Sequence, residues 1–224
     1  MRMLSGELAV TSIVARPLVA VALAGAVAAA VERFGGIDAV INNASAIDLS
    51  RTDDVDMKKY DLMQDINVRG TFLMSKLALP ALRASDQGHI LTLSPPLNLD
   101  PRWAGKHLAY TMAKYGMSLT TLGLAEELKA DGIRVNSLWP RTLIDTAAIR
   151  NMPHGERIVQ AARGAEIMAD AAHAVLTGSN RTDGGRPSGN FYTDEEVLAA
   201  AGVTDFRPYS LGAPEDQLVP DIFL

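Results

Sequence analysis

Short candidate strands alternate with long helical stretches along this chain, and this alternation is the feature that most constrains its fold. The candidate strands, of five or six residues, are Ile37–Asn42, His89–Leu93 and Ile133–Leu138, between glycine, proline or polar turn residues. The first of them, IDAVIN, is a short apolar run, which is typical of strands that are buried on both faces of a parallel sheet. Since parallel neighbours need helical crossovers, the sequence predicts an α/β fold with helices on both faces of a parallel sheet.

The helices between these runs are predicted from the helical spacing of apolar residues. Four stretches show this spacing: Leu18–Phe34, Met57–Arg83, Leu108–Ala130 and Glu166–Thr177. Gly35 and Gly36 supply a stop for the first of them. The segment after Asn190 becomes rich in turns beyond Gly202, and we expect it to wrap over the domain as a tail, or to be partly disordered, rather than to form a second domain.

The N-terminal region holds a further candidate strand. Leu8–Val14 is short, rich in β-branched residues and bounded by Gly6 and Pro17, which is typical of a strand. An unpaired apolar edge on the Ile37–Asn42 strand would be an aggregation liability. We therefore expect the Leu8–Val14 strand to pair with that edge through a right-handed crossover.

The Ala/Val-rich run Pro17–Val31 has to be tested as a membrane segment. It has 15 uncharged residues, fewer than the roughly 20 that span a bilayer core. Glu7 and Arg16 interrupt the apolar character upstream, which breaks the apolar core that a signal peptide needs. We expect a buried helix here, no membrane span and a cytoplasmic protein.

Composition disfavours or excludes several classes of function. A formal net charge of −5 disfavours a nucleic-acid binder, which needs a basic face for phosphate contacts. The absence of cysteine excludes a disulfide scaffold, a thiolate metal site and a cysteine nucleophile. The four histidines lack the spacing of metal-binding motifs, so we expect no metal site.

Tyr110 and Lys114 form the leading candidate catalytic pair. They are four residues apart on the helix predicted after the His89–Leu93 strand, so their side chains share one face. An ammonium close to a phenol lowers the pKa of the phenol and makes it a proton donor or acceptor usable near neutrality. The spacing alone is common and also fits an ordinary surface pair, so the context decides.

Five segments in a fixed order supply that context. They are INNASA at 41–46, INVRGTF at 66–72, ILTLSPP at 90–96, YTMAK at 110–114 and VNSLWPRT at 135–142. The series closely resembles the short-chain dehydrogenase/reductase family, most of all its hydroxysteroid dehydrogenase-like branch, over residues 31–151. The resemblance implies a three-layer Rossmann-like parallel sheet flanked by helices. It also implies reversible hydride transfer between an alcohol or carbonyl carbon and NADP or NAD.

The resemblance also assigns roles to single residues. Tyr110 would be the catalytic acid/base, and Lys114 would lower its pKa and hold the nicotinamide ribose. Asn67 would kink its helix and hold a water in a proton relay. Asn43 would meet the cofactor ribose, and the backbone of Leu143 would meet the nicotinamide carboxamide. The implied cofactor-binding set is therefore Asn43, Tyr110, Lys114 and Leu143.

The chain departs from the family pattern at the substrate and cofactor positions. Pro95 stands where the family has the serine that bonds the substrate oxygen, and proline cannot donate a hydrogen bond. Ser94, one residue earlier, either takes over this catalytic role or is a turn residue at the strand end. Ser45 and Arg141 stand where the family has glycine, and their side chains would crowd the path of the cofactor.

The glycine-rich fingerprint that binds the dinucleotide in this family is absent from Met1–Val31. The sequence therefore predicts one N-terminally truncated domain over residues 1–224. Its parts would be a degenerate strand and helix at 1–36, a catalytic core at 37–150, and a substrate-side helix with a C-terminal tail at 151–224.

Two functions from different classes follow. The first is an active oxidoreductase that acts on a small-molecule alcohol or carbonyl compound. The second is a catalytically inactive relative or a dimerising interaction module that binds no dinucleotide. In the family, the helices that correspond to Met57–Arg83 and Leu108–Ala130 pack across a twofold axis, so the resemblance implies a homodimer or homotetramer. Trp103, which precedes Tyr110, either lines the substrate pocket or serves packing.

Overall fold

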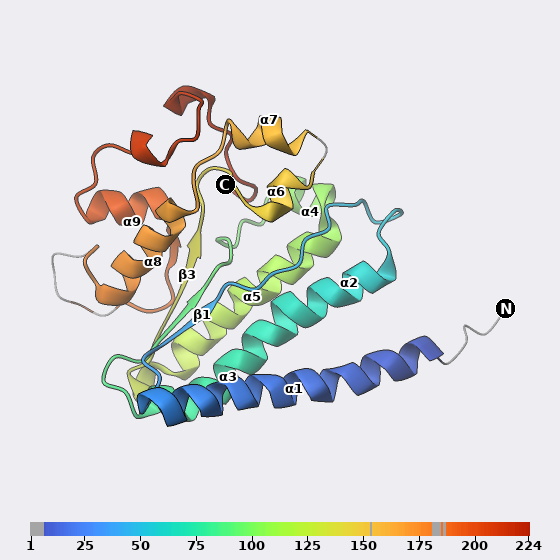
Figure 1. The fold of residues 1–224 in the computed structure, drawn as a ribbon, viewed down its shortest axis with the longest axis vertical. Helices are drawn as coiled ribbons and strands as arrows, with labels where there is room; N and C mark the ends of the chain where they lie inside the picture. The colour runs from blue at the N-terminus through green and yellow to red at the C-terminus, as the bar shows by residue number, and fades with distance from the viewer. Residues whose placement is uncertain (1–6, 153, 181–184, 186) are drawn as a thin grey trace.

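The computed structural model describes residues 7–152, 154–180, 185 and 187–224, with side chains from residue 18 onward. In this part of the chain a four-stranded parallel sheet lies between two layers of helices (Figure 1). The strands, in sheet order, are β1 (Ala39–Asn42), β2 (His89–Thr92), β3 (Arg134–Trp139) and β4 (Phe191–Thr193). The predicted α/β, Rossmann-like class is confirmed.

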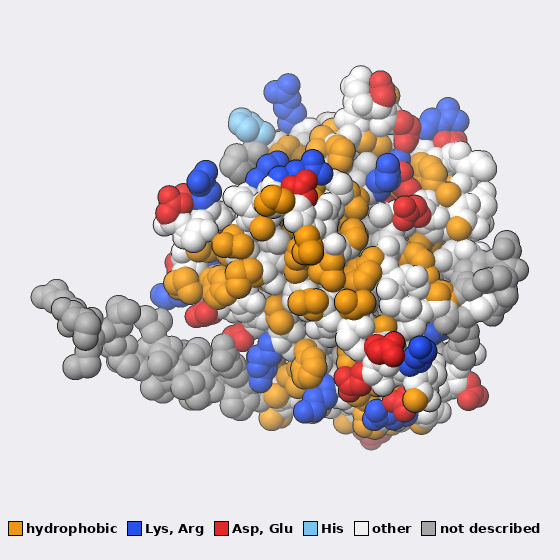
Figure 2. All heavy atoms as spheres, turned by 180° about the vertical axis from the view of Figure 1, so that it is seen from behind, with side chains coloured by type: hydrophobic (Ala, Val, Ile, Leu, Met, Phe, Trp, Pro, Cys, Tyr) orange, Lys and Arg blue, Asp and Glu red, His pale blue; other side chains and the backbone are white. Residues whose placement is uncertain are grey.

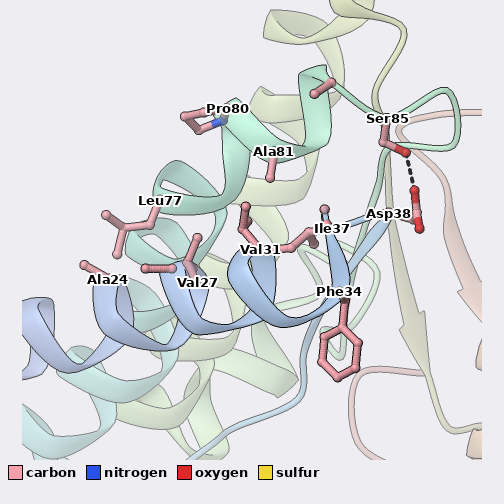
Figure 3. Close-up of a pocket in the computed structure, with 14 residues that line it drawn as sticks. Ala24, Val27, Val31, Phe34, Ile37, Asp38, Leu77, Pro80, Ala81 and Ser85 are labelled. Atoms are coloured by element: carbon pink, nitrogen blue, oxygen red, sulfur yellow. Dashed lines mark hydrogen bonds between the residues drawn. The ribbon is translucent and has the colours of Figure 1, made fainter.

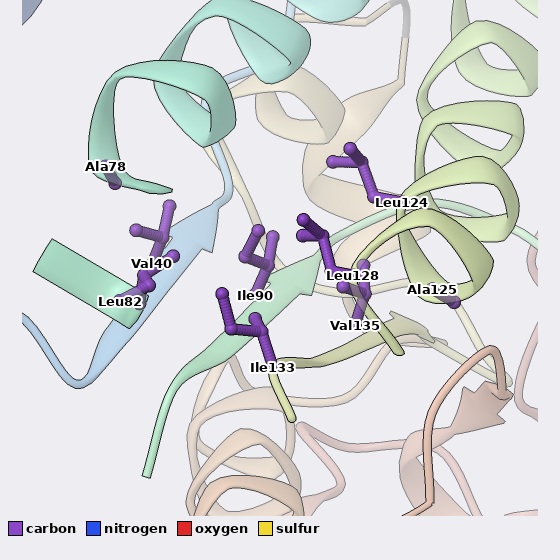
Figure 4. Close-up of a cluster of buried hydrophobic side chains, with 9 residues drawn as sticks. All are labelled: Val40, Ala78, Leu82, Ile90, Leu124, Ala125, Leu128, Ile133 and Val135. Atoms are coloured by element: carbon purple, nitrogen blue, oxygen red, sulfur yellow. The ribbon is translucent and has the colours of Figure 1, made fainter. Parts of the chain in front are cut away.

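One face of the sheet is covered by the two long helical stretches that the sequence predicts. The first is continuous from α2 (Met57–Met63) through a π-helical segment (Gln64–Gly70) to α3 (Thr71–Arg83). The second is α5 (Leu108–Glu127), followed by a 3-10 turn at Lys129–Asp131. The core between these helices and the sheet (Figure 4) consists of Val40, Ala78, Leu82, Ile90, Leu124, Ala125, Leu128, Ile133 and Val135.

The opposite face is covered by α8 (Glu166–Thr177), which has the predicted bounds, and by α9 (Asp194–Ala200). Apolar residues of α8 and α9 pack there against Leu91 of β2 and Leu138 of β3. Both β4 and α9 belong to the segment that we expected to be a tail or partly disordered, so for residues 191–200 this expectation is wrong. A strand of three residues is too short to show a periodicity of its own, and it becomes visible only through its pairing with β3.

Apart from α1 (Glu7–Phe34), which is described below, the remaining helices are short. They are α4 (Pro101–Lys106), α6 (Ala147–Arg150), α7 (Gly155–Val159) and 3-10 turns at Arg207–Tyr209 and Glu215–Gln217. The first two follow the carboxyl ends of β2 and β3, and the C-terminus of the chain returns to the same end of the sheet (Figure 1). This end of the sheet is therefore built from loops and short helices, as is usual for ligand sites of α/β folds.

The N-terminal region differs from expectation. One helix, α1 (Glu7–Phe34), replaces both the predicted strand Leu8–Val14 and the predicted helix. The strand prediction and its pairing with β1 are wrong, since β1 is an edge strand of the described sheet. An α-helix satisfies its backbone hydrogen bonds internally, and the alanine-rich run that follows favours it. The predicted stop is confirmed, because α1 ends before Gly35 at φ +85°.

The exposure of this region also corrects two expectations. Leu18, Val21 and Phe34 are 66%, 69% and 76% exposed, so α1 is not the buried helix that we expected. In β1 the side chains of Val40 and Asn42 are buried while those of Ala39 and Ile41 are exposed, so only one face of this strand is covered. Within the described residues, no helix has the length and apolar character that a membrane span requires.

Candidate active site

Helix α5 places Tyr110 and Lys114 at the carboxyl end of the central strands. The Lys114 ammonium donates a hydrogen bond of 2.9 Å to the carbonyl oxygen of Leu93, directly after β2. It also lies 5.1 Å from the ring centre of Trp139, the last residue of β3. Tyr110 is 5% and Lys114 3% exposed. The two side chains are therefore buried at the edge where α/β proteins bind their ligands.

Burial sets the pKa values of this pair. It lowers the pKa of Lys114 to about 8, against the opposing field of the Asp221 carboxylate. It raises the pKa of the Tyr110 hydroxyl above its ordinary value of 10, and Asp221 adds to that rise. The direction is opposite to our expectation for Tyr110, because exclusion of water and the Asp221 charge both disfavour the phenolate. Tyr110 is therefore protonated at neutral pH in this arrangement.

Asn67 lies in the π-helical segment and is completely buried. Its side-chain oxygen accepts a 2.8 Å hydrogen bond from the Ala46 amide, and its side-chain nitrogen donates one of 2.9 Å to the Ala46 carbonyl. The helix widens into π geometry at the position where we expected a kink, and the amide of Asn67 holds the backbone of the loop that follows β1. The water that Asn67 would hold stays a prediction.

Ser94 is buried and faces a chain of hydroxyl groups in the core. Ser137 donates a 2.9 Å hydrogen bond to Thr121, and the hydroxyls of Ser94 and Ser137 are 2.7 Å apart. Because Ser137 has one hydroxyl proton and uses it toward Thr121, Ser94 donates to Ser137. The proton of Ser94 is therefore engaged within the core.

The other residues implied by the resemblance lie around the same end of the sheet. Asn43 is exposed just beyond β1. The amide of Leu143 donates a 2.9 Å hydrogen bond to the carbonyl of Val219. The amide of Arg141 donates one of 2.9 Å to the carboxylate of Asp194, whose pKa burial raises to about 6. The structure thus places a backbone group of the C-terminal segment, residues 219–224, against Leu143.

The C-terminal segment fills the space over Tyr110. The ring of Phe223 is 2% exposed and lies among four aromatic rings, which we call the aromatic cage. Ring-centre distances from Phe223 are 5.3 Å to Tyr115, 6.0 Å to Trp103, 6.0 Å to Trp139 and 6.3 Å to Tyr110. The Tyr110 ring is stacked on that of Phe223 at an interplanar angle of 27°. Trp103, for which the sequence allowed either a pocket-lining or a packing role, is therefore part of this cage.

Polar contacts fix the segment in this position. The amide of Asp221 donates to the Arg141 carbonyl at 3.0 Å, and the indole N–H of Trp139 donates to the Ile222 carbonyl at 3.0 Å. Burial raises the pKa of Asp221 to about 7, although the Ile222 amide and the charge of Lys114 oppose the rise. Sequence reasoning missed Asp221 and Phe223. The only signal was an apolar end, VPDIFL, on a turn-rich stretch.

An open groove lies away from this site. An open groove of about 790 Å³ runs between α1 and α3 beside the start of β1 (Figure 3). Val27, Val31, Leu77 and Pro80 line it, and a hydrogen bond between Ser85 and Asp38 stands at its end. None of the candidate site residues lines this groove, so it is separate from the Tyr110 site.

The residues around Lys114 fit one end of a nicotinamide dinucleotide. The Lys114 ammonium, the Leu143 amide and the Asn43 side chain are donors that suit ribose hydroxyls and a carboxamide. Two of these donors already have partners, since Lys114 bonds Leu93 and Leu143 bonds Val219. Among the described residues no strand precedes β1, so no glycine-rich strand-to-helix turn for the pyrophosphate is found there.

Comparison with known proteins identifies the family to which the chain belongs. A sequence profile described as enoyl-(acyl carrier protein) reductase matches residues 20–176. The chain belongs to the short-chain dehydrogenase/reductase family, whose members are oxidoreductases. The crystal structure of a Xanthomonas campestris protein described as a dehydrogenase superposes with a TM-score of 0.81 at 50% identity, covering 90% of this chain and 72% of that one. A Mycobacterium thermoresistibile short-chain dehydrogenase gives 0.81 at 45% identity, with 92% and 71% covered.

Curated relatives point to one branch of the family. Hydroxysteroid dehydrogenase-like protein 2 of Xenopus laevis is 50% identical over 202 residues, which are 90% of this chain and 46% of the relative. The protein of the same name from Mus musculus is 49% identical over 202 residues, which are 89% of this chain and 39% of the relative. The chain thus spans less than half the length of these relatives.

Proposed function

We propose that this chain is an NAD(P)-dependent oxidoreductase that interconverts an alcohol and a carbonyl compound, with Tyr110 as the acid/base. The observation that carries the proposal is the joint burial of Tyr110 and Lys114 on one face of α5, at the carboxyl end of β2 and β3. A buried ammonium beside a buried phenol is costly, and such pairs cluster at functional sites.

Each side chain has a distinct task in this proposal. Tyr110, protonated at neutral pH, donates its proton to the carbonyl oxygen that becomes the alcohol. Lys114 holds a ribose hydroxyl and keeps a positive charge near the phenolate that Tyr110 becomes. Ser94 has its proton engaged with Ser137, so Tyr110 is the proton donor to the substrate. A bound nicotinamide supplies or accepts the hydride.

Binding of a nicotinamide dinucleotide tests the proposal most directly. A ligand at a hundredfold excess over its Kd stabilises the fold by about 2.7 kcal/mol, which for a chain of this size raises the melting temperature by roughly 5–10 °C. We expect such a rise with NADPH or NADH. In Lys114→Met, which removes the ribose-binding ammonium and keeps the length of the side chain, the rise should disappear.

Lys76→Met is the matched control, since it removes an exposed lysine of α3 and should retain the full thermal shift. A wild-type melting temperature that neither nucleotide changes would contradict the proposal. An equal shift in wild type and Lys114→Met would contradict the role of the lysine.

The second candidate is a relative that binds no dinucleotide. Two observations favour it: Leu143 already bonds Val219, and the outer edge of β1 is unpaired within the described sheet. Under this alternative Tyr110 and Lys114 are remnants, and neither nucleotide changes the melting temperature. The same titration therefore separates the two candidates.

We also propose that two copies associate through α5. Four large apolar side chains of this helix are exposed: Leu108, Met112, Leu119 and Leu122. Figure 2 shows hydrophobic side chains gathered across the middle of the face seen from behind, and a contiguous apolar surface of this kind marks an interface. Light scattering should give the mass of a dimer or tetramer, and Met112→Lys with Leu119→Lys should return a monomer. A monomeric wild type would exclude this association.

A further inference from the structure

We propose that the C-terminal segment is a built-in ligand of the candidate active site, with Phe223 in the position of the apolar group of the substrate. The segment must then leave before substrate and cofactor can bind. The pocket that it vacates would accept a carbonyl compound with a flat apolar ring. This inference rests on the proposed function and specifies its substrate class.

The first support is the shape of the aromatic cage. Phe223 is enclosed by Trp103, Tyr110, Tyr115 and Trp139, each within 6.3 Å between ring centres. Offset and tilted ring contacts of this kind favour a flat aromatic or apolar group in the enclosed space. Because Tyr110 is one wall of the cage, a ring bound there lies next to the proposed proton donor.

The second support is that the C-terminal segment accepts hydrogen bonds from donors of the candidate active site. Three donors of the site bond backbone carbonyls of residues 219–224: Leu143 N–H to Val219, the Trp139 indole N–H to Ile222, and the Asn98 side-chain amide to Phe223 at 3.3 Å. These donors would otherwise be free to meet the carbonyl groups of a ligand. The segment therefore combines a flat ring with flanking carbonyl oxygens, which are the features that we assign to the substrate.

The third support is the backbone of Phe223 itself. Its φ is +78°, in the left-handed region that residues other than glycine rarely adopt. Such a conformation persists only where surrounding contacts hold it, and it occurs preferentially at functional sites. Here the ring contacts in the aromatic cage hold it together with the hydrogen bonds to the carbonyls of Ile222 and Phe223, so loss of the ring contacts should loosen the segment.

The C-terminal segment should compete with substrate and cofactor for the candidate active site. A ligand that can bind only the open form has its apparent affinity reduced by the fraction of molecules that are open. The amide of Leu143 links the two sites of the proposal, because Val219 and a nicotinamide carboxamide would need the same N–H. Opening of the segment should therefore strengthen the binding of an aromatic ketone and of NADPH together.

The experiment compares wild type with Phe223→Ala. Both tryptophans of the chain, Trp103 and Trp139, belong to the aromatic cage, so tryptophan emission reports on this site alone. We expect a shift of the emission to longer wavelength in Phe223→Ala, because water enters the cage. Calorimetric titration should show acetophenone and NADPH each binding at least fivefold more tightly than to wild type.

Two further variants sharpen the test. Leu211→Ala removes a half-exposed leucine of the C-terminal region outside the cage and should match wild type in emission and in both affinities. Asn98→Ala removes one bond to the segment while the cage keeps its ring. It should strengthen the binding of NADPH, for which Asn98 is not a proposed donor, in the same direction as Phe223→Ala. Asn98→Ala gives the answer if Phe223→Ala does not fold.

The outcomes are distinct. A gain below fivefold for acetophenone in a folded Phe223→Ala, or unchanged emission, would overturn the inference. NADPH that binds wild type and Phe223→Ala equally would overturn it as well. If acetophenone binding rises as expected while NADPH binds no variant, the C-terminal segment does occupy the pocket and the dinucleotide-dependent function fails.

Discussion

Replacement of Tyr110 by phenylalanine should lower turnover by about 10²–10⁴-fold, the contribution typical of a positioned acid or base. Only the hydroxyl is lost, and the ring that stacks on Phe223 remains. The Tyr110 hydroxyl has no hydrogen-bond partner among the described residues, so its removal leaves no other buried group unsatisfied. We therefore expect an unchanged melting temperature and a decrease confined to kcat, measured from NADPH consumption with an aromatic ketone.

Tyr209→Phe is the matched control, because the hydroxyl of Tyr209 bonds Asp170 far from the cage. It should retain full turnover. NADPH should still bind Tyr110→Phe, with an affinity within a few-fold of that of wild type, since Asn43, Lys114 and Leu143 retain the other proposed cofactor contacts. Full activity in Tyr110→Phe would refute the assigned acid/base, whereas loss of NADPH binding would show that the tyrosine acts on the cofactor instead.

The largest effect on stability is expected at Arg163. Its side chain is 2% exposed and forms ion pairs with Glu195 at 2.8 Å and with Glu215 at 2.6 Å. It also donates to the Phe206 carbonyl at 3.0 Å and to the Ser210 hydroxyl at 3.1 Å. Removing one partner of an ion pair costs about 3–5 kcal/mol when the remaining charge is buried, and less where water reaches it, as at Glu195 and Glu215, whose side chains are 21% and 45% exposed. Arg163→Met should lower the free energy of unfolding by about 2–3 kcal/mol in urea denaturation.

The dependence of the free energy of unfolding on acidic pH gives a second test of the Arg163 ion pairs. Hydrogen bonding to Arg163 lowers the pKa of Glu215 below 4.5 in the folded state. A lowered carboxyl pKa stabilises the fold above the ordinary value of 4.5, and this stabilisation is lost as the pH falls through the lowered pKa. In Arg163→Met the pKa of Glu215 is no longer lowered by this pairing, so the stability of the variant should fall less than that of wild type as the pH drops below 4.5. An identical pH dependence in both proteins would contradict the pairing.

Arg207→Met serves as the control for charge removal. Arg207 pairs with Asp205 at 2.8 Å, but its side chain is 80% exposed. Exposed pairs contribute about 0–1 kcal/mol, so this variant should unfold close to wild type. A loss at Arg163 no larger than that at Arg207 would show that burial of the pair has no energetic consequence.

Strong local patterns made part of this fold predictable. β2 and β3 are short segments between turn residues, and every residue in them is buried; α8 has helical spacing and ends at Gly178. The proximity of Tyr110 and Lys114 to the end of β2 follows from their spacing on α5 and from the chain order of the motifs. These predictions depend on short segments and on the regular geometry of helices and parallel strands.

Tertiary context determined the rest. Leu8–Val14 has the composition of a strand but lies in a helix, because no partner strand overrides the helical preference of the alanine-rich run beside it. β4 acquires its identity by pairing with β3. Phe223 is about 110 residues from Tyr110, and contacts of such separation leave no local pattern. The raised pKa of Tyr110 was also not predictable, because it comes from burial, which the Tyr110–Lys114 spacing does not reveal.

The all-parallel sheet also determines how this chain must fold. Each ladder joins residues about 50 positions apart, as in the pairs Ala39–His89, His89–Arg134 and Ser137–Phe191, so each pairing must close a long loop first. The described residues contain no hairpin that could nucleate the sheet locally. Helices will therefore form ahead of the sheet, and refolding from denaturant will be slow. The partly folded chain will meanwhile expose the apolar faces of β2 and β3, which makes dilution and low temperature the conditions of choice for its recovery.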